Sequence, residues 1–454
     1  MIPRPHMPLV PTLRGAVLFA ILAAVGATGL PSAHRTVAAA AARGLPAARH
    51  VLSPRAGRSG AGAAPVPLIA VALRGDIYVV PADGSAPPRR LTAYGYNSSP
   101  VLSPHGRLIA YLSVPPGALG NGGARPSHNI WIVPVNGASD GSSGYKITPT
   151  NLGVDCGGLV WAPDGRRLAY LLGNDQGAGT DLVVVDDQGH SRTTVQHVNG
   201  DAVADSSMVA WSPDSRRVAV ASPPAPPASN SPLLIAVANA DGSGKRSFAV
   251  QFPPDSLGPH NQSGHGSYPD PFVLAWAPDG RHLVVQTKGS GMGLTVTGIW
   301  QVADSGGLAR LLVGTPAGVR QGYDTTRDGS PLGVTTHFSF SPDGRYLLLD
   351  RTPLVPGPHN AGGFWLANAD GTAGRFLNPA PLVCCALAQS VWLTDSSGLA
   401  FVSLQLLAGT GGPVRAQLYS TDLSGASRLL YGLTDPDQSK IDLARAYGCV
   451  ECDR

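Results

Sequence analysis

The stretch VWAPDGR at residues 160–166 is one of six copies of a short pattern that decides the fold of this chain. A large apolar residue is followed by a small one and then by proline, aspartate, glycine and arginine, and an apolar run comes directly after. The other copies are VLSPHGR (101–107), AWSPDSR (210–216), AWAPDGR (275–281), SFSPDGR (339–345) and a degenerate one, VWLTDSS (391–397). Copies spaced about 50 to 65 residues apart predict an array of one repeated supersecondary unit.

Each copy has the chemistry of a strand, a tight turn and a second strand. Proline presets the first turn angle, aspartate can accept a main-chain N–H, and glycine adopts the positive φ that closes the turn. The large residue before the turn, such as Trp161, is expected to pack between neighbouring sheets. A second apolar hairpin follows each copy, as in IWIV at 130–133 before Asn136 and Gly137. Two hairpins give four antiparallel strands, the blade of a β-propeller.

The composition agrees with an all-β chain. Its 454 residues include 57 glycines and 42 prolines, whereas Glu451 is the only glutamate. This richness in turn residues disfavours helical arrays. Residues 1–60 hold seven arginines and no acidic residue, which leaves 26 basic and 29 acidic residues in the rest. Nucleic-acid binding needs clustered positive charge, so we expect no nucleic-acid partner.

The number of blades follows from a mismatch between the two hairpins. The first hairpin occurs six times but the second occurs seven times, and the extra copy comes first, in the unit 67–92. That unit has candidate strands but lacks an innermost one. A circular array must close, and the alternating segment 441–445 can supply the missing strand. We therefore expect an all-β propeller of four-stranded antiparallel blades with seven blades, closed by the C-terminal segment; six blades is the alternative.

The N-terminus has the features of an export signal. Arg4 and Arg14 precede an apolar stretch at 16–30, and small residues follow it. We expect a signal peptide or N-terminal anchor at 1–33 and a disordered tether rich in Ala, Gly, Pro and Arg at 34–66. The expected location is extracytoplasmic: secreted, periplasmic or anchored to the envelope. A membrane contact is expected only through an uncleaved N-terminal segment.

The repeated motif resembles that of the TolB-type propellers, a WD-like family found in bacterial envelope proteins and in the propellers of prolyl-oligopeptidase-like enzymes. The resemblance covers about residues 67–430 and rests on the six motifs above. TolB itself has an α/β domain before the propeller, whereas here a signal and a tether precede the first strand. The peptidases add an α/β-hydrolase domain, for which no residues remain here. The resemblance thus implies a free-standing exported propeller at 67–448, followed by a cysteine-containing tail at 449–454.

Loop lengths indicate which face of the disc binds a ligand. Turns inside the hairpins are short, whereas the connections on the opposite face vary widely, with long ones at 113–128, 251–271 and 314–335. Irregular backbone that the fold does not require is a common place for binding groups. Two consecutive long loops should meet there. The candidate ligand-binding residues on them are His260, His265, Tyr268, Asp270, Arg320, Tyr323, Asp324 and Arg327. The alternative interpretation is a solvated loop.

The same loops give no recognisable metal motif, because the spacing of His260 and His265 matches none, and we expect neither a metal nor a cofactor. Two strings look catalytic but do not fit their context. GASDG at 137–141 matches a nucleophile elbow, yet it lies in a hairpin turn and not between a strand and a helix. DSGG at 304–307 lies in the equivalent turn of another repeat. We therefore assign no catalytic residue, and we expect the turn aspartates to serve as main-chain acceptors.

Five cysteines remain: Cys156, the adjacent pair Cys384 and Cys385, and Cys449 and Cys452 in the tail. In an exported protein cysteines are first interpreted as disulfides. A tail cysteine bonded to Cys384 or Cys385 would hold the ring closed. A local bond between Cys449 and Cys452 and a redox or metal role are the alternatives.

The sequence favours an exported or envelope-tethered propeller that acts as a protein-interaction or ligand-binding scaffold, with a protein or a cell-envelope polymer as partner. The opposing hypothesis is a propeller enzyme of lyase or hydrolase type with its site at the channel mouth, because the fold alone excludes no chemistry. Histidine or carboxylate side chains that converge near the axis would favour the enzyme. A third possibility is a structural spacer.

Overall fold

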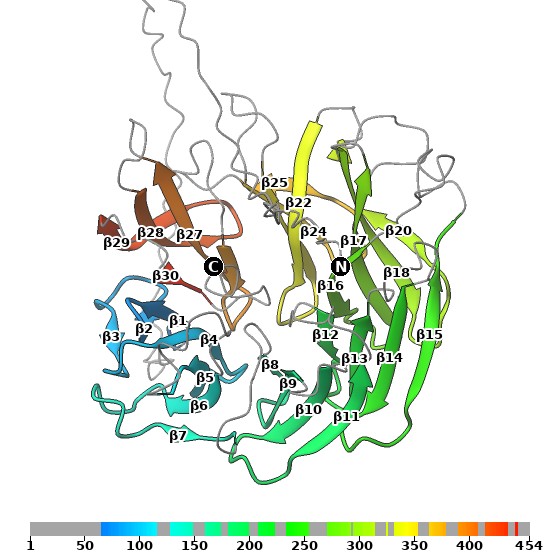
Figure 1. Cartoon of the computed structure of the whole chain (residues 1–454). Helices are drawn as coiled ribbons and strands as arrows, with labels where there is room; N and C mark the ends of the chain where they lie inside the picture. The colour runs from blue at the N-terminus through cyan, green and yellow to red at the C-terminus, as the bar shows by residue number, and fades with distance from the viewer. Residues whose placement is uncertain are drawn as a thin grey trace, which may run out of the picture. The chain divides into compact units, whose positions relative to one another are not determined.

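Residues 64–454 form one compact unit, and each element of regular structure assigned in it is a β-strand. The computed structural model describes residues 65–115, 128–148, 159–173, 180–198, 208–222, 233–253, 270–291, 294–313, 324–325, 331–352, 363–377, 389–406, 414–434 and 441–443. The strands form seven sheets around a ring, each with four antiparallel strands (Figure 1). The predicted seven-bladed β-propeller is confirmed, and the six-bladed alternative is wrong.

The blades are numbered here in chain order, and their strands are named as in Figure 1. Blade 1 contains β30 (Ile441–Asp442), β1 (Leu68–Leu73), β2 (Asp76–Pro81) and β3 (Arg89–Arg90). Blade 2 contains β4 (Asn97–Leu102), β5 (Leu108–Ser113), β6 (Asn129–Pro134) and β7 (Tyr145–Lys146). Blade 3 contains β8 (Val160–Trp161), β9 (Arg167–Gly173), β10 (Thr180–Asp186) and β11 (Thr193–Val198). Blade 4 contains β12 (Val209–Trp211), β13 (Arg217–Ser222), β14 (Leu234–Asn239) and β15 (Arg246–Gln251).

The three remaining blades follow the same plan with small additions. Blade 5 contains β16 (Asp270–Trp276), β17 (His282–Gly291), β18 (Leu294–Ala303) and β20 (Arg310–Val313). Blade 6 contains β22 (Pro331–Phe340), β23 (Tyr346–Thr352), β24 (Gly363–Asn368) and β25 (Arg375–Leu377), with β21 (Asp324–Thr325) on its edge. Blade 7 contains β26 (Gln389–Trp392), β27 (Gly398–Leu406), β28 (Val414–Asp422) and β29 (Ser427–Thr434). The short β19 (Gly307–Leu308) pairs in parallel with β15 and so joins blade 5 to blade 4.

The hydrophobic core consists of seven clusters, one at each interface between neighbouring blades. Trp161 of blade 3 packs among residues of blade 2. In the same way Trp211 of blade 4 packs against blade 3, and Trp276 of blade 5 packs against blade 4. The predicted place of the large residues, between sheets, is therefore confirmed. The indole N–H of Trp161 donates to the carbonyl of Val101 at 3.0 Å, which ties the two sheets together.

The ring closes between the first and last blades as expected. β30 pairs with β1 through Ala72 and Leu73, and it leads into Leu443, which is fully buried in the cluster between blades 7 and 1. The Ser420 hydroxyl of blade 7 also donates to the carbonyl of Ala82 in blade 1, at 2.6 Å. The C-terminal segment thus supplies the strand that the opening unit lacks.

The turn of the repeated motif has the predicted chemistry. In blade 3 the N–H of Gly165, at φ 62°, donates to the carbonyl of Ala162, and Asp164 Oδ1 accepts the N–H of Arg166 at 3.0 Å. In blades 4 and 7 a serine occupies the glycine position and keeps the positive φ, at 59° for Ser215 and 61° for Ser396. The aspartates of these turns are therefore main-chain acceptors, as expected.

Both serines use their hydroxyls between blades. Ser215 Oγ accepts the N–H of Asp164 in blade 3 at 2.9 Å, and Ser396 Oγ accepts the N–H of Asp343 in blade 6 at 3.0 Å. A non-glycine residue in the left-handed region is strained. Here the strained position gains a bond that glycine could not make.

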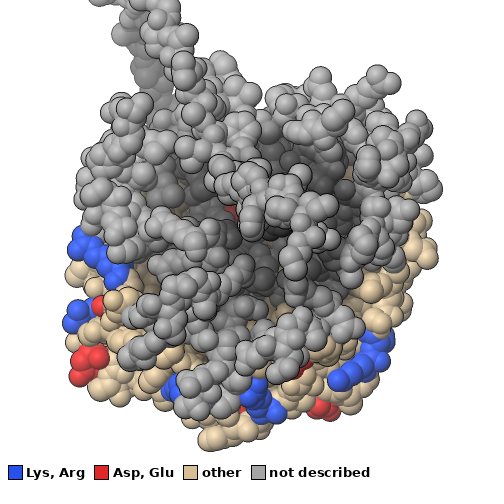
Figure 2. Space-filling view, viewed as in Figure 1, with Lys and Arg blue, Asp and Glu red and all other residues tan. Residues whose placement is uncertain are grey.

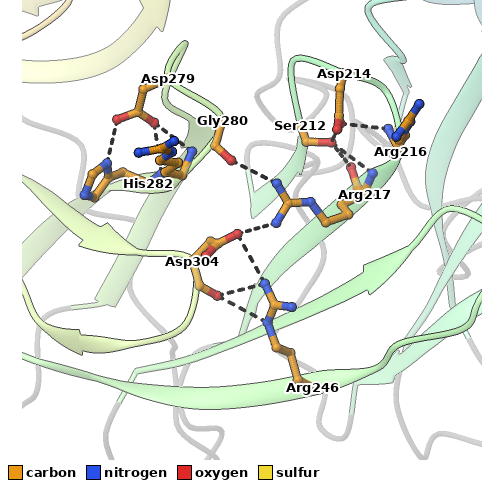
Figure 3. A network of polar contacts seen from close by, with 10 residues as sticks. Ser212, Asp214, Arg216, Arg217, Arg246, Asp279, Gly280, His282 and Asp304 are labelled. Atoms are coloured by element: carbon orange, nitrogen blue, oxygen red, sulfur yellow. Dashed lines mark hydrogen bonds and ion pairs between the residues drawn. The ribbon is translucent and has the colours of Figure 1, made fainter.

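Blades 4 and 5 are held together by a polar network that includes residues of their hairpin turns (Figure 3). Arg217 of blade 4 forms an ion pair with Asp304 of blade 5 and donates to the carbonyl of Gly280 at 2.9 Å. Arg246 reaches the carboxylate of Asp304 at 3.3 Å. The DSGG turn that begins at Asp304 is therefore part of a structural joint, in agreement with its assignment as a hairpin turn.

Candidate ligand-binding pocket

The two long loops that the sequence favoured lie almost wholly outside the described residues. His260, His265, Tyr268, Arg320, Tyr323 and Arg327 all lie outside them, and so do the five cysteines. Only the backbones of Asp270 and Asp324 are described: Asp270 pairs with Lys288, and Asp324 pairs with Gly333. The proposed ligand site on these loops and the disulfides therefore stay predictions.

A pocket of about 530 Å³ lies within the described part of the chain, between blades 1 and 2. Its walls come from the connection between β3 and β4, from the ends of β5 and β6 next to the 113–128 connection, and from the outer strand β7. Ligand sites of small molecules commonly have this size. The pocket is lined by Thr92, Ala93, Tyr94, Asn97, Tyr111, Ser113, Val114, Pro115, Asn129, Trp131, Asp140, Gly141 and Lys146.

Strand register places the lining side chains in two rows. Asn97 of β4 pairs with Ser113 of β5, and Ser113 pairs with Asn129 of β6. Two residues further along, Tyr111 of β5 pairs with Trp131 of β6. Since residues i and i+2 of a strand point to the same face of the sheet, both rows face the same way, towards blade 1. Trp131 continues the second row by pairing with Lys146 of β7.

The polar atoms of these rows are not used by the fold. Within the described ranges no hydrogen bond reaches the hydroxyls of Tyr111 and Ser113, the indole N–H of Trp131 or the ammonium of Lys146. The amide of Asn129 uses its Oδ1 to accept from Thr148, which leaves its Nδ2 free within those ranges.

The amide of Asn97 is likewise only half used, with the roles of its two atoms reversed. Its Nδ2 donates to Thr92 at 3.0 Å, and its Oδ1 has no described partner. Asn97, Tyr111, Ser113 and Asn129 are each more than nine-tenths buried. Their unpaired polar atoms are not among the fully buried atoms without a partner, so they reach the open space of the pocket. These groups therefore form a set of donors and acceptors, held by their strands, that a ligand can contact.

The connection between blades 1 and 2 is held in place by a carboxylate. Asp76 Oδ1 accepts the N–H of Tyr94 at 2.8 Å and that of Gly95 at 3.0 Å. The rings of Tyr94 and Tyr96 meet edge to face with centroids 5.6 Å apart, and both rings are largely exposed. Burial and the neighbouring Tyr96 raise the pKa of Tyr94 above its usual value. An aromatic rim therefore stands beside the pocket in a fixed position.

The charges at the pocket are balanced. Burial, with a further contribution from the negative charge of Asp76, raises the pKa of Tyr111 to about 12, so its hydroxyl stays neutral and able to donate. Hydrogen bonds from Ser142 lower the pKa of Asp140, which is charged at neutral pH. Lys146 contributes one positive charge on the same wall. The site thus suits a neutral polar ligand better than a polyanion.

The surface around the ring shows the same balance. Figure 2 shows lysines and arginines in small groups among aspartates along the described rim of the visible face. The described residues also contain no group of three histidine, cysteine or acidic side chains able to hold a metal ion. No helix among them has the length and hydrophobicity needed to cross a membrane.

The pocket in the described part of the chain lies at blades 1 and 2, whereas the two loops that the sequence favoured stay an untested prediction. The signal that could have found it is the string TAYGYN at 92–97, which places two aromatic rings and an amide in one blade-to-blade connection. Polar residues at the ends of apolar strands, such as Ser113 and Asn129, are the second signal.

A second buried polar cluster lies at the interface of blades 6 and 7. Asp350 is 1% exposed and accepts a hydrogen bond from the Ser390 hydroxyl at 2.5 Å. His337 pairs with Asp350 across the strands and is also buried. A histidine and a carboxylate on inner strands are the kind of residues that a propeller enzyme would need.

Three solved structures illustrate the similarity of this chain to known folds. An oligogalacturonate lyase in complex with manganese is 13% identical, with 80% of this chain and 83% of the other covered and a TM-score of 0.48. The propeller domain of the Trilobed protease from Pyrococcus furiosus is 14% identical, covering 74% and 82%, with a TM-score of 0.44. Prolyl oligopeptidase B from Galerina marginata is 12% identical, covering 80% and 48%, with a TM-score of 0.47.

Identities this low concern the fold alone and carry no activity over to this chain. None of the three is described as TolB-type, so that resemblance stays an expectation from the motif. No family model matches the chain, and no curated protein matches it.

Proposed function

We propose that this chain is an exported β-propeller that acts as a binding scaffold and takes a unit of its partner into the pocket between blades 1 and 2. The partner is a cell-envelope polymer or a protein of the same compartment. The observation that carries this proposal is the set of polar groups without described partners that Asn97, Tyr111, Ser113 and Asn129, four otherwise buried side chains, present to one pocket.

The expected location supports such a partner. The arginines before the apolar stretch at 16–30 and the small residues after it are features of an export signal. Cell fractionation with an antibody to the propeller tests this point, and recovery of the chain in the cytosol alone would contradict it.

The binding test uses the purified full chain and a fractionated extract of the native cell envelope. We expect a fraction of the extract to raise the melting temperature of the wild-type chain, because a ligand that binds the folded state stabilises it. The pocket variant Ser113→Val should lose most of this increase. Stabilisation of equal size in both proteins would contradict the pocket as the site.

The alternative is a propeller enzyme, and the pair of Asp350 and Ser390 with His337 is the observation that favours it. Its test is the release of soluble fragments from envelope polymers by the full chain. Release that is lost in Asp350→Asn and kept in Ser113→Val would establish the enzyme and reject the pure scaffold.

A further inference from the structure

We propose that the pocket between blades 1 and 2 is a saccharide subsite, in which a pyranose ring lies against Trp131 within reach of the Tyr111 hydroxyl. This inference rests on the proposed function of the pocket, and it adds the chemical class of the ligand.

The first argument is the mixture of donors and acceptors. Lys146 and the indole of Trp131 can only donate, Asn129 offers a donor through Nδ2, and Asn97 offers an acceptor through Oδ1. The hydroxyls of Tyr111 and Ser113 can do both. A ligand that satisfies them must itself carry donors and acceptors close together around a compact frame. The hydroxyl groups of a sugar ring have this property, since each donates one hydrogen bond and accepts others.

The second argument is the arrangement of the two rows. The polar row Asn97, Ser113 and Asn129 runs parallel to the aromatic row that Tyr111 and Trp131 form, two residues along the same strands. A pyranose has an apolar face of C–H groups and an equatorial rim of hydroxyls. Trp131 is only partly buried and can offer apolar ring surface to that face, whereas Tyr111 is buried and lines the pocket beside it. Trp131 and the polar row can therefore contact the face and the rim of one ring.

Other ligand classes fit less well. A phosphate or polyanion needs several cations, whereas Lys146 is the one basic residue in the lining of this pocket and the charged Asp140 also lines it. An apolar ligand would bury the polar row without giving it partners, at a cost for each group left unpaired. A flat nucleobase could stack on the aromatic row but brings few groups for the buried polar row.

Blade 3 offers a matched control for the central tyrosine. Tyr170 of β9 occupies the position in its repeat that Tyr111 occupies in β5, and it is equally buried. Its hydroxyl, however, lies near Arg192 and outside the pocket. Tyr111→Phe removes a hydroxyl at the pocket, whereas Tyr170→Phe makes the same change away from it.

The experiment is isothermal titration of the full chain with named probes. These are glucose, galactose, mannose, N-acetylglucosamine, their methyl glycosides, the matching β1,4-linked disaccharides, adenosine and the amino acid tryptophan. We expect at least one sugar to bind, and Tyr111→Phe and Ser113→Ala each to weaken it about fivefold to tenfold, as for the loss of one hydrogen bond. Tyr111→Phe should leave the melting temperature unchanged. Tyr170→Phe should leave the affinity unchanged.

Several outcomes would overturn the inference. If the envelope extract still stabilises the chain through the pocket but no sugar binds, the saccharide class is wrong and the binding scaffold stands. If neither extract nor sugar acts through the pocket, both proposals fail. Binding of adenosine or tryptophan in place of sugars, or sugar binding that neither Tyr111→Phe nor Ser113→Ala weakens, also rejects the saccharide subsite.

Discussion

The guanidinium of Arg217 in blade 4 lies 4.6 Å from the centre of the Trp276 ring in blade 5. The equivalent pair one blade earlier, Arg167 over Trp211, lies at 5.4 Å. In both cases the arginine stands directly after the repeated turn, and the tryptophan stands directly before the turn of the next blade. The repeat therefore carries its own connection between neighbours: a cation on one copy and an aromatic ring on the following one.

The first prediction concerns Arg217. Replacement of Arg217 by Met should lower the free energy of unfolding by about 2 kcal/mol, because the contact with Trp276, the bond to Gly280 and the ion pair with Asp304 are all lost. The neighbouring exposed Arg216→Met is the control and should change it by less than about 0.5 kcal/mol. Urea denaturation at neutral pH measures both. Equal effects would show that the network does not stabilise the joint.

The second prediction compares two tryptophans that both lie under an arginine. The indole N–H of Trp211 donates to the carbonyl of Val160 at 3.1 Å, whereas that of Trp276 is buried without a hydrogen-bond partner in the described structure. Trp211→Phe removes this hydrogen bond, whereas Trp276→Phe removes none, so Trp211→Phe should cost about 1 kcal/mol more than Trp276→Phe. Chemical denaturation of the two variants gives the difference. A larger cost for Trp276→Phe would contradict this assignment.

The third prediction uses the serine in the glycine position of blade 4. Ser215→Ala keeps a Cβ at φ 59° but loses the bond to the N–H of Asp164, so we expect it to be destabilised. Ser215→Gly loses the same bond and also removes the backbone strain. We therefore expect the glycine variant to be more stable than the alanine variant by about 1 kcal/mol. Thermal unfolding of the pair decides it, and the reverse order would show that φ is not the source of strain.

The fourth prediction concerns the ring closure. Leu443 follows β30 and is fully buried between blades 7 and 1. Leu443→Ala should cost about 2 to 4 kcal/mol, as for other large-to-small changes in a core. The exposed Leu234 of β14, changed to alanine, is the matched control and should have little effect. Unchanged stability of Leu443→Ala would mean that the C-terminal strand does not close the ring in solution.

The fifth prediction is a loss of stability in acid. The hydrogen bond from Ser212, supported by the N–H of Arg216, lowers the pKa of Asp214, and Ser243 does the same for Asp241. A pKa that is lower in the folded state than in the unfolded one stabilises the fold above the unfolded value, and this contribution is lost as the pH falls through the folded value. Stability should therefore be constant near neutral pH and fall below about pH 4.

The measurement is the free energy of unfolding in urea between pH 6 and pH 3. Asp214→Asn should reduce the slope in the acid range, because one carboxylate with a lowered pKa is removed. An unchanged slope would show that the turn aspartates are not coupled to folding.

The sequence by itself determined the repeat, the strands and the number of blades. These follow from local chemistry: a proline, aspartate and glycine set a tight turn wherever they occur, and alternating apolar residues set a strand. The count of hairpins then left one strand missing, and segment 441–445 was apolar in the right pattern to supply it.

The tertiary structure decided what lies between the blades. Strand register and the rotation of one sheet against the next bring Arg217 to Trp276 and Ser215 to Asp164. They also place the row of Asn97, Ser113 and Asn129 beside Tyr111 and Trp131. Such contacts join residues that no local rule links. For that reason the sequence could not single out the pocket at the first two blades, and its prediction for the loops around residues 260 and 323 concerns residues outside the described ranges.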